Sequence, residues 1–498
     1  MSIRRYTTMP TTAQILELEG IVIVDLAPPP VISGIGTGVV GMVGEFLDGP
    51  FANPYAAQEI TSTRDFLDKF GDYDVRVGDS GKEGNGYRAL MRRMFSKLIC
   101  VRVDTTQAQT LTITRDAGAT GVLTIAAGTE IENSLAATKK YMTDRTVTWT
   151  ASEVGSANAK TVGLTGTGTV NAGLNELNTW IAGIPEALLT QTNPDFATKQ
   201  NPITSALLDT AYITAIDKLN WGPVLTSGIS IVFSARTSQT IRNYLKTHVD
   251  EQSDGPRGRM AIMRGIFGET KANAQTQAQN SSSKGDRTVY CWPNGQMIIP
   301  KISSDPTDTM IDSFLAAILS QLASERDPAE TTSFTQRILS PISGLESAAP
   351  SMGTSVYKDL KANGICGPVF EPLPLGAWFF QSGVTTDLTS GKEPIYRRRK
   401  ADQIEDTLGA ALLPYQKSIL TNSLKTAIVG QIESFLEEEK IQERIADYKV
   451  DPVSGNTQTR LDLGIFTVIC QVKLFASGRN IVLQAEIGET VKIIRETA

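Results

Sequence analysis

The sequence predicts a multidomain protein of the α+β or α/β class, and three observations support this prediction. The chain has 498 residues, which is too long for one ordinary hydrophobic core and favours roughly two to four domains. Residues 105–170 are rich in Thr, Ala and Gly and alternate apolar with Thr positions, which is the period of short β-strands. Residues 203–345 mix apolar strand-like runs with helical periodicity, as α/β folds do.

The N-terminal region contains a strand-like run that proline separates from the next one. Residues 21–24 are apolar and β-branched, and the triple proline Pro28–Pro30 follows them. Proline fixes φ and cannot continue a helix, and consecutive prolines favour an extended chain. A second β-rich run covers Val39–Val43. We therefore expect a first strand that a stiff spacer separates from its own core, so that it can pair with another chain.

Two other interpretations of this region are weaker. Gly36–Gly41 fits the dinucleotide-binding pattern G-x-G-x-x-G, but that pattern needs a helix directly after it, and further glycines interrupt the residues that follow. Residues 26–44 carry no charge and approach the length of a membrane span, but their prolines and glycines would leave backbone groups unpaired in lipid. We expect neither a nucleotide-binding loop nor membrane insertion.

Local signals place the next elements. Ser62 followed by Asp65 is a capping-box signature and Gly71 is a natural helix stop, so a short helix is expected between them. Helical apolar spacing at 87–98 leads into a strand-like run at 98–103. The Thr-rich segment after residue 105 predicts a small β-barrel or sandwich, or alternatively a β insertion at the surface.

The middle of the chain reads as alternating helices and strands. The polar, low-complexity tract 271–284 within it predicts an exposed loop. The expected helices are 205–219, 238–249 and 309–324, and the expected strands are 229–233, 260–264 and 289–292.

The last third of the chain begins with a helix ended by Gly364 and a strand at 377–380. A helix opens at Tyr396, and its basic run Arg397–Lys400 is interpreted as a solvated charge run. A long amphipathic helix follows, capped by Asn422, with Glu437, Glu438, Glu439 and Lys440 on its outer face. The expected final strands are 465–475 and 480–486, and the tail 488–498 can add a third.

Composition and the absence of known motifs argue against several classes of function. The net charge is −6, so no basic excess favours nucleic acid. The four cysteines lie far apart and indicate thiols in a reducing compartment. The only histidine, His248, lies at helical spacing, and no metal-binding, nucleophile–histidine or phosphate-loop motif accompanies it. We expect no enzyme and no cofactor; a carboxylate-based α/β hydrolase is the enzymatic alternative.

Several segments in order resemble the contractile tail sheath proteins of phages and related injection machines. These are the strand–proline–strand layout of 20–43, the segment Thr61–Gly71, the helix leading into Val101-Arg102-Val103, the basic run followed by Ile404-Glu405, and the helix–strand–strand order at the C-terminus. The resemblance implies a discontinuous α/β core domain built from N- and C-terminal blocks, with exchanged terminal arms. An inserted β-rich domain and an inserted α/β domain interrupt this core.

The resemblance also implies domain limits and interaction residues. The expected parts are an N-terminal arm (1–30), a first core segment (31–104), the β-rich insertion (105–196), the α/β insertion (197–345), a second core segment (346–477) and a C-terminal arm (478–498). The arm residues expected to link subunits are Ile21, Val22, Ile23, Val24, Val491 and Ile493. The residues expected to face an inner tube, unless this is merely a solvated helix face, are Lys425, Glu433, Glu437, Glu438 and Lys440.

The resemblance implies a structural subunit that polymerises around a tail tube and contracts to drive it through a cell envelope. The expected partners are other copies of the chain in stacked hexameric rings, the tail tube protein, and baseplate and tail terminator proteins, with no nucleic acid. The expected location is the virion tail, assembled in the bacterial host cytoplasm. Another tail structural protein, such as a baseplate component, is the alternative within this class.

Overall fold

The computed structural model divides into two compact units, 36–402 (the large unit) and 1–35 with 403–498 (the small unit). It contains strands, helices and several separate sheets, so the predicted mixed α/β class is confirmed. The structure describes residues 2–6, 20–24, 38–46, 55–71, 97–103, 109–115, 119–125, 147–154, 163–168, 189–191, 205–220, 228–254, 258–299, 303–330, 342–346, 349–371, 377–389, 391–476, 482–486 and 492–496.

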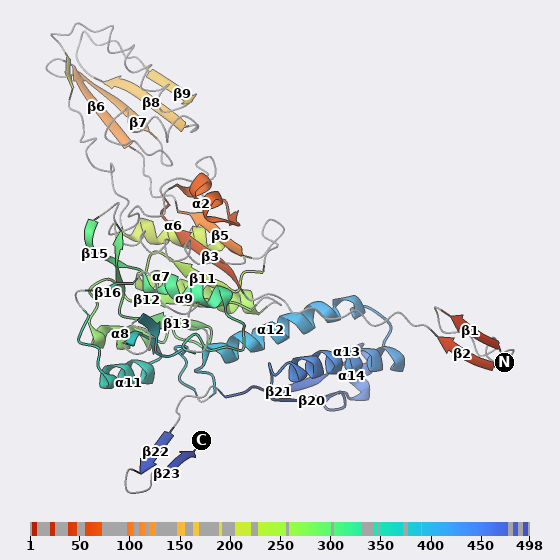
Figure 1. Cartoon of the computed structure of the whole chain (residues 1–498). Coiled ribbons are helices and arrows are strands. Elements are labelled where there is room, and N and C mark those ends of the chain that lie inside the picture. The colour runs from red at the N-terminus through yellow and green to blue at the C-terminus, as the bar shows by residue number, and fades with distance from the viewer. Residues whose placement is uncertain are drawn as a thin grey trace. The chain divides into compact units, whose positions relative to one another are not determined.

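A seven-stranded sheet organises the large unit (Figure 1). Its neighbouring strands run parallel except for β4, which is antiparallel to β5. In its middle, Val40 lies opposite Ile231 on one side and Leu98 on the other. The strands, in spatial order, are β17 (Ile365–Cys366), β13 (Thr288–Cys291), β12 (Met260–Arg264), β11 (Ile231–Ser234), β3 (Val39–Gly44), β5 (Lys97–Arg102) and β4 (Gln58–Ile60).

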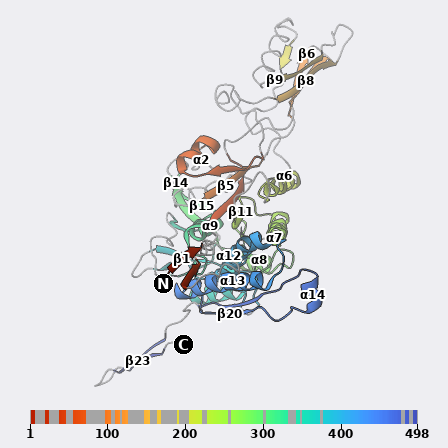
Figure 2. The same cartoon turned by 90° about the vertical axis from the view of Figure 1, so that its right-hand side faces the viewer.

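Helices cover this sheet because its central strands are apolar on both faces. Figure 2 shows α9 (Ile311–Gln321) on one side of the sheet, and α6 (Ser205–Asp217) and α7 (Gln239–Ser253) on the other. Residues 311–320 of helix α9 are all buried, including the polar Asp312, Ser313 and Ser320. The predicted helices and strands of the middle segment are therefore confirmed, with shifts of a few residues at their ends.

The sheet combines segments that the sequence analysis assigned to separate domains. β3 and β5 come from 31–104, whereas β11, β12 and β13 come from 197–345. One sheet therefore contains strands from both segments, and 36–104 lies in the same compact unit as 197–345. Periodicity located the strands, but it contains no information on which strands pair.

The last glycine of the G-x-G-x-x-G pattern has a packing role within a strand. Gly41 lies inside β3, and its backbone pairs with residues of both neighbouring strands. A Cβ atom at this position would approach the side chains of Leu219 and Ile229 to 3.1 and 3.2 Å. Gly41 therefore permits close packing of a helix end and a loop against the sheet, rather than the approach of a phosphate group.

The predicted short helix after residue 61 is confirmed as α2 (Thr63–Phe70). Ser62 Oγ accepts a hydrogen bond from the Asp65 amide at 3.1 Å, as a helix N-cap does. Gly71 ends the helix at φ +79°, a conformation that favours glycine. Phe66 and Phe70 are buried against the ring of Phe46, so the helix covers the edge of the sheet near β4.

The predicted exposed loop at 271–284 is wrong in its first half, which forms helix α8 (Lys271–Ala278). Thr270 caps its N-terminus by accepting from the Asn273 amide at 3.3 Å. Ala274 and Ala278, one turn apart, are buried. The low complexity of this segment suggested a loop, but two alanines on one face are sufficient to pack α8 against the rest of the large unit.

The Thr-rich segment forms a five-stranded sheet in the order β10-β6-β7-β8-β9, with antiparallel pairing throughout. In the described part of this segment it is one open sheet, not the predicted barrel or sandwich. The strands are β6 (Gln109–Arg115), β7 (Ala119–Ile125), β8 (Val147–Val154), β9 (Gly163–Gly168) and β10 (Leu189–Gln191).

Smaller elements complete the large unit. They are the antiparallel sheet of β15 (Ser303–Thr309), β14 (Gly295–Ile299) and β16 (Gly344–Leu345), the pair β18 (Pro368–Glu371) and β19 (Ala377–Phe380), and helix α11 (Thr354–Ala362). Gly364 follows α11 with φ +70°, as expected of a helix stop.

The small unit is assembled from the end of the chain and from its first strands. α12 (Ile395–Leu412) begins in the large unit, and its residues from Gln403 onward belong to the small unit. Among the described residues, no helix is long and apolar enough to cross a membrane. The other elements are the 3₁₀ turn η3 (Leu413–Tyr415), α13 (Asn422–Ile441), α14 (Gln458–Asp462), β20 (Asp447–Asp451), β21 (Ile469–Lys473), and the terminal strands β1 (Ser2–Tyr6), β2 (Gly20–Val24), β22 (Val482–Glu486) and β23 (Lys492–Glu496).

The single histidine is a packing residue in the interior of α7. His248 is buried, and its Nε2 lies 3.0 Å from Nη1 of Arg259. Arg259 Nη1 also donates to the Leu219 carbonyl oxygen at 2.7 Å. Burial, assisted by the positive charge of Arg259, lowers the pKa of His248 from 6.5 to about 3. The imidazole is therefore neutral in the folded protein at physiological pH.

We expect this buried imidazole to make stability depend on pH. The unfolded chain protonates His248 below about pH 6.5 and the folded chain only near pH 3, so the free energy of unfolding decreases as the pH falls through this window. The variant His248→Gln should lose this component, whose slope is at most about 1.4 kcal/mol per pH unit. Chemical denaturation of both proteins at about pH 7.5 and about pH 5.5 measures it. Identical pH dependence in the two proteins would contradict the prediction.

Candidate functional site

The small unit has a limited hydrophobic core between α13 and the β20–β21 pair. Ile432, Phe435 and Leu436 lie at helical spacing on one face of α13 and are buried there, with Ile404 from α12 and Ile445 after α13. Thr421 caps the helix by accepting from the Leu424 amide at 3.2 Å, so the cap is one residue before the predicted Asn422. The predicted amphipathic helix is thus confirmed.

The β20–β21 pair leaves this core incompletely covered. It is an antiparallel pair with Tyr448 opposite Val472 and Val450 opposite Cys470. These side chains pack against the core but stay half-buried. Within the described residues each strand has one neighbour, so the outer edge of each presents backbone N–H and C=O groups for which the sheet supplies no partner. An added strand on either edge would cover apolar surface and satisfy those groups.

The terminal residues predicted to link subunits lie in strands where the structure describes them. Ile21–Val24 belong to β2, which pairs in parallel with β1. Ile493 belongs to β23, where it lies opposite Ala485 of β22. Val491 lies outside the described residues. Both terminal pairs are separate two-stranded sheets, and the role of these residues in linking subunits stays a prediction.

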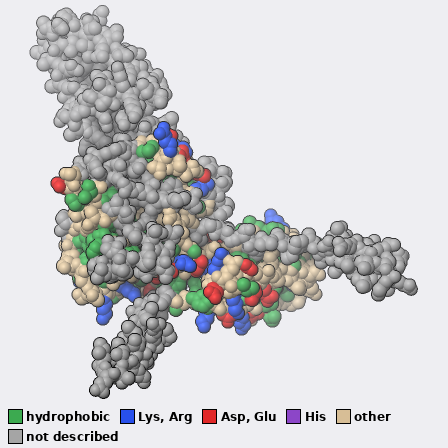
Figure 3. Space-filling view, viewed as in Figure 1, with side chains coloured by type: hydrophobic (Ala, Val, Ile, Leu, Met, Phe, Trp, Pro, Cys, Tyr) green, Lys and Arg blue, Asp and Glu red, His purple; other side chains and the backbone are tan. Residues whose placement is uncertain are grey.

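The charged residues of α13 divide into two groups. Glu437 accepts a hydrogen bond from the Tyr448 hydroxyl at 3.0 Å, and Lys440 Nζ lies 2.8 Å from Asp447 Oδ1. That contact raises the pKa of Lys440 and lowers the pKa of Asp447. Glu437 and Lys440 therefore hold α13 against β20 of their own chain. Figure 3 shows acidic, basic and apolar side chains intermixed over this part of the surface.

The second group is available for other contacts. Glu433 and Glu438 are exposed on α13, and Glu438 accepts a hydrogen bond from the side chain of Gln442 one turn later. Lys425 is half-buried near the start of the helix. Among the five residues predicted to face an inner tube, Glu433, Glu437, Glu438 and Lys440 are exposed, and Lys425 is half-buried.

One outward assignment on this helix is wrong. Glu439 is buried, although the sequence analysis placed it on the outer face with its neighbours. Its Oε1 accepts from Nη1 of Arg444 at 3.1 Å, and the Arg444 amide donates to the Glu439 carbonyl oxygen at 2.9 Å. The residue lies three positions after Leu436 and so shares its face, and the arginine compensates the buried charge.

The connection between β20 and β21 is an ordered loop with exposed apolar residues. Asn456 holds it closed: its Nδ2 donates to the Thr467 carbonyl oxygen at 2.6 Å, and its Oδ1 accepts from the Thr467 amide at 2.7 Å. Val453, Leu463 and Ile465 are exposed along it. The sequence alone does not reveal this surface, because a few separated apolar residues have no periodicity that distinguishes exposed from buried positions.

Metal-binding clusters and reactive thiols are the chemical sites to consider among the described residues. Among them, no cluster of three or more His, Cys, Asp or Glu side chains is arranged to hold a metal ion. Cys100, Cys291 and Cys366 are buried free thiols, and burial raises the pKa of each. The β20–β21 pair is one of several two-stranded sheets in the described residues whose outer edges have no sheet partner.

The fold resembles solved subunits of contractile assemblies. The helical sheath of the anti-feeding prophage in its contracted state matches with a TM-score of 0.55 and 13% identity, over 94% of this chain and 97% of that chain. The sheath of the extracellular contractile injection system PVC in its contracted state matches with a TM-score of 0.54 and 12% identity, over 97% and 99% of the two chains. A chain of the six-fold symmetrised anti-feeding prophage baseplate matches with a TM-score of 0.52 and 13% identity, over 95% and 99%.

No protein-family model and no curated protein sequence matches the chain. At these identities the structural matches show a shared fold, and they extend over almost the whole of each chain. The resemblance to sheath proteins predicted from the sequence is thereby confirmed for the fold.

The incompletely covered core should be sensitive to truncation of α13. Leu436 is 0% exposed, whereas Leu463 in the β20–β21 loop is 73% exposed. We expect Leu436→Ala to cost about 2–5 kcal/mol and Leu463→Ala less than about 0.5 kcal/mol. Hydrogen exchange of the β20 and β21 amides should accelerate only in the first variant. Equal exchange in both variants would mean that α13 does not support the sheet.

Proposed function

We propose that this chain is the subunit of a contractile sheath that polymerises around an inner tube and shortens to drive the tube through a target envelope. The observation that carries the proposal is the shared fold with two contractile sheath subunits over more than nine-tenths of the chain. The open β20–β21 sheet and the two terminal strand pairs support it, because they supply both partners of a strand-exchange joint.

Strand exchange is the proposed mode of self-assembly. β20 and β21 each offer a free edge, and an arm from a neighbouring subunit would add to each edge by main-chain hydrogen bonds. The half-buried Tyr448, Val450, Cys470 and Val472 would become covered by the added strands. The N-terminal arm with Ile21–Val24 and the C-terminal arm with Ile493 are the donors in this proposal. Extended arms keep subunits connected while the subunits move.

Contraction then follows from a difference in interface energy between two arrangements of the same subunits. The long form is held in a metastable state on the tube, and each subunit gains interface in the short form. The connecting arms transmit the change from one ring to the next. In this mechanism bistable interfaces carry the function and catalysis has no part, in agreement with the structural role of the similar proteins.

The proposed partners are further copies of the chain in six-membered rings, a tail tube protein, and baseplate and terminator proteins at the ends of the sheath. The similarity to a chain of a six-fold baseplate supports the ring number and also favours the second candidate, a baseplate-proximal role. The proposed location is a virion tail or tail-like particle, assembled in the host cytoplasm. Electron microscopy distinguishes the candidates, since a sheath subunit forms long tubes and a baseplate component forms single rings.

Removal of the N-terminal arm should separate folding from assembly. Deletion of residues 1–27 leaves the large unit, which starts at Gly36, untouched. We expect the truncated protein to keep the far-ultraviolet circular dichroism and Tm of the full chain but to remain monomeric in light scattering. Full-length protein under the same conditions, which should form tubes, is the control. A truncated protein that unfolds, or that still polymerises, would show that the arm does not link subunits.

The exposed acidic residues of α13 are the proposed contact with the tube. Exposed ion pairs contribute only about 0–1 kcal/mol each, so they can align a sheath on a tube without locking it. Reversal of charge at Glu433 and Glu438, which leaves the Glu437–Tyr448 contact intact, should yield sheath that polymerises in the short form without tube. Glu251→Lys, on an exposed position of α7, is the matched control. Normal tube-filled particles from the double variant would place the tube contact elsewhere.

A further inference from the structure

The second half of the basic run at the start of α12 is buried, and its first half, Arg397 and Arg398, is half-buried, which contradicts the interpretation of the run as a solvated charge run. Arg399 is 3% exposed and Lys400 is fully buried. Nη2 of Arg399 donates to the carbonyl oxygens of Leu319 and Leu322 at 2.8 and 3.0 Å. These carbonyls end α9, where helix geometry leaves acceptors unpaired and the helix dipole favours a cation. Burial lowers the pKa of Arg399 to about 10, so the guanidinium remains charged at neutral pH.

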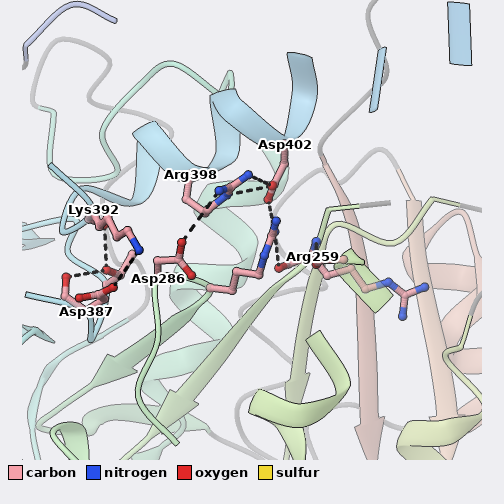
Figure 4. Close-up of polar contacts among 9 residues, drawn as sticks. Arg259, Asp286, Asp387, Lys392, Arg398 and Asp402 are labelled. Carbon is pink, nitrogen blue, oxygen red and sulfur yellow. Dashed lines mark hydrogen bonds and ion pairs between the residues drawn. The ribbon is translucent and has the colours of Figure 1, made fainter. Parts of the chain in front are cut away.

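One turn further, Asp402 joins α12 to the central sheet. It is 5% exposed, and its Oδ2 lies 2.7 Å from Nη1 of Arg287, which directly precedes β13. Arg398, four residues earlier on α12, donates to Asp402 Oδ1 from Nε and Nη2 at 2.9 and 2.6 Å. Figure 4 shows these two α12 side chains converging, with Asp286 on the far side of Arg398 at 3.9 Å.

The backbone also closes around this carboxylate. A Cβ atom placed on Gly258 would lie 2.3 Å from Asp402 Cγ. Only glycine therefore allows the segment before β12 to approach α12 this closely. The α12 anchor, as we name Arg398, Arg399, Lys400 and Asp402, is thus in contact with α9, with the approach to β12 and with the approach to β13.

The anchor lies at the point in the chain where one compact unit ends and the other begins. Asp402 is the last residue of the large unit, and Gln403 the first of the small unit's C-terminal segment. Ile404 then belongs to the small-unit core, against which Leu408 and Leu412 also pack. No glycine or proline occurs between Ile395 and Leu408, so the helix crosses this boundary without a residue that would bend it.

We propose that the α12 anchor is the joint that transmits movement between the two units during contraction. The proposal rests on the sheath function proposed above. Neighbouring subunits move the small unit through its exchanged strands, and a helix fixed in the large unit by directional, charged contacts carries that unit with it. An apolar contact tolerates rotation of the helix about its axis, whereas hydrogen bonds from Arg398 and Arg287 to both oxygens of one carboxylate do not.

The variant Asp402→Asn tests this joint, because it keeps the side chain's shape and removes its charge. In the isolated subunit we expect amide exchange in 395–402 to accelerate at least about tenfold, with α13 unchanged. Asp209→Asn is the matched control, since Asp209 belongs to α6 and forms an ion pair with the buried Arg236. Arg398→Gln, which removes one partner of Asp402, provides a second variant should Asp402→Asn fold poorly.

In assembled tubes the proposed joint can be tested by a measurement that general destabilisation of the subunit would not affect, namely the order of the large units in helical reconstructions. We expect Asp402→Asn subunits to form tubes through their small units, while the large units lose their fixed orientation and become blurred in helical reconstructions. Asp209→Asn tubes should show both units sharply. Equally ordered large units in both variants, with wild-type exchange at 395–402, would overturn the proposed joint. Wild-type protein that forms no polymer at all would instead refute the sheath function.

Discussion

Among the described residues, the small unit packs its core against a two-stranded sheet whose two outer edges are open. Two strands cannot bury the apolar residues of both faces, and β20 and β21 leave Tyr448 and Val472 half-buried over the core of α13. Open strand edges are a hazard for a monomer, because they favour pairing with other chains. In the strand exchange proposed above, these edges would supply the specificity and the direction of assembly.

The large unit has the opposite property. Its central strands are paired on both sides and helices cover both faces of its sheet, so its core residues are already buried. Its one conspicuous irregularity is the number of charged side chains inside it, including Arg264 beside Asp312 at 3.7 Å. The large unit thus has a covered core, whereas the small unit has open strand edges. This combination is consistent with subunits that change position while the strands that link them stay paired.

The sequence predicted the positions of helices and strands better than it predicted which strands and side chains contact one another. Periodicity located α6, α7 and α9 and their strands, because one buried face requires a regular apolar pattern. It could not show that β3 and β11 are neighbours, which depends on contacts distant in sequence. It also failed where a charge is buried. The composition of the run ending at Lys400 is that of a surface, but Arg399 donates to carbonyl oxygens at the end of α9 and Lys400 lies 3.7 Å from Glu325. The α13 surface was predictable as a face, and the spacing of Glu439 from Leu436 indicated its burial, but its partner Arg444 lies beyond the helix and could not be identified from the helical pattern.

The placement of charge follows from what each contact has to do. A buried ion pair carries a large desolvation cost, and replacing it with apolar residues is often neutral for stability, so its advantage is a single fixed geometry. Arg398 and Asp402 have this character, and they lie where α12 leaves the large unit. On α13 the accessible carboxylates of Glu433 and Glu438 remain in water, where ion pairs are weak and easily exchanged. A sheath must hold its own subunits firmly and release its tube completely. Buried charge at the joint and exposed charge on the proposed tube-facing helix suit those two requirements, and the reverse arrangement would defeat both.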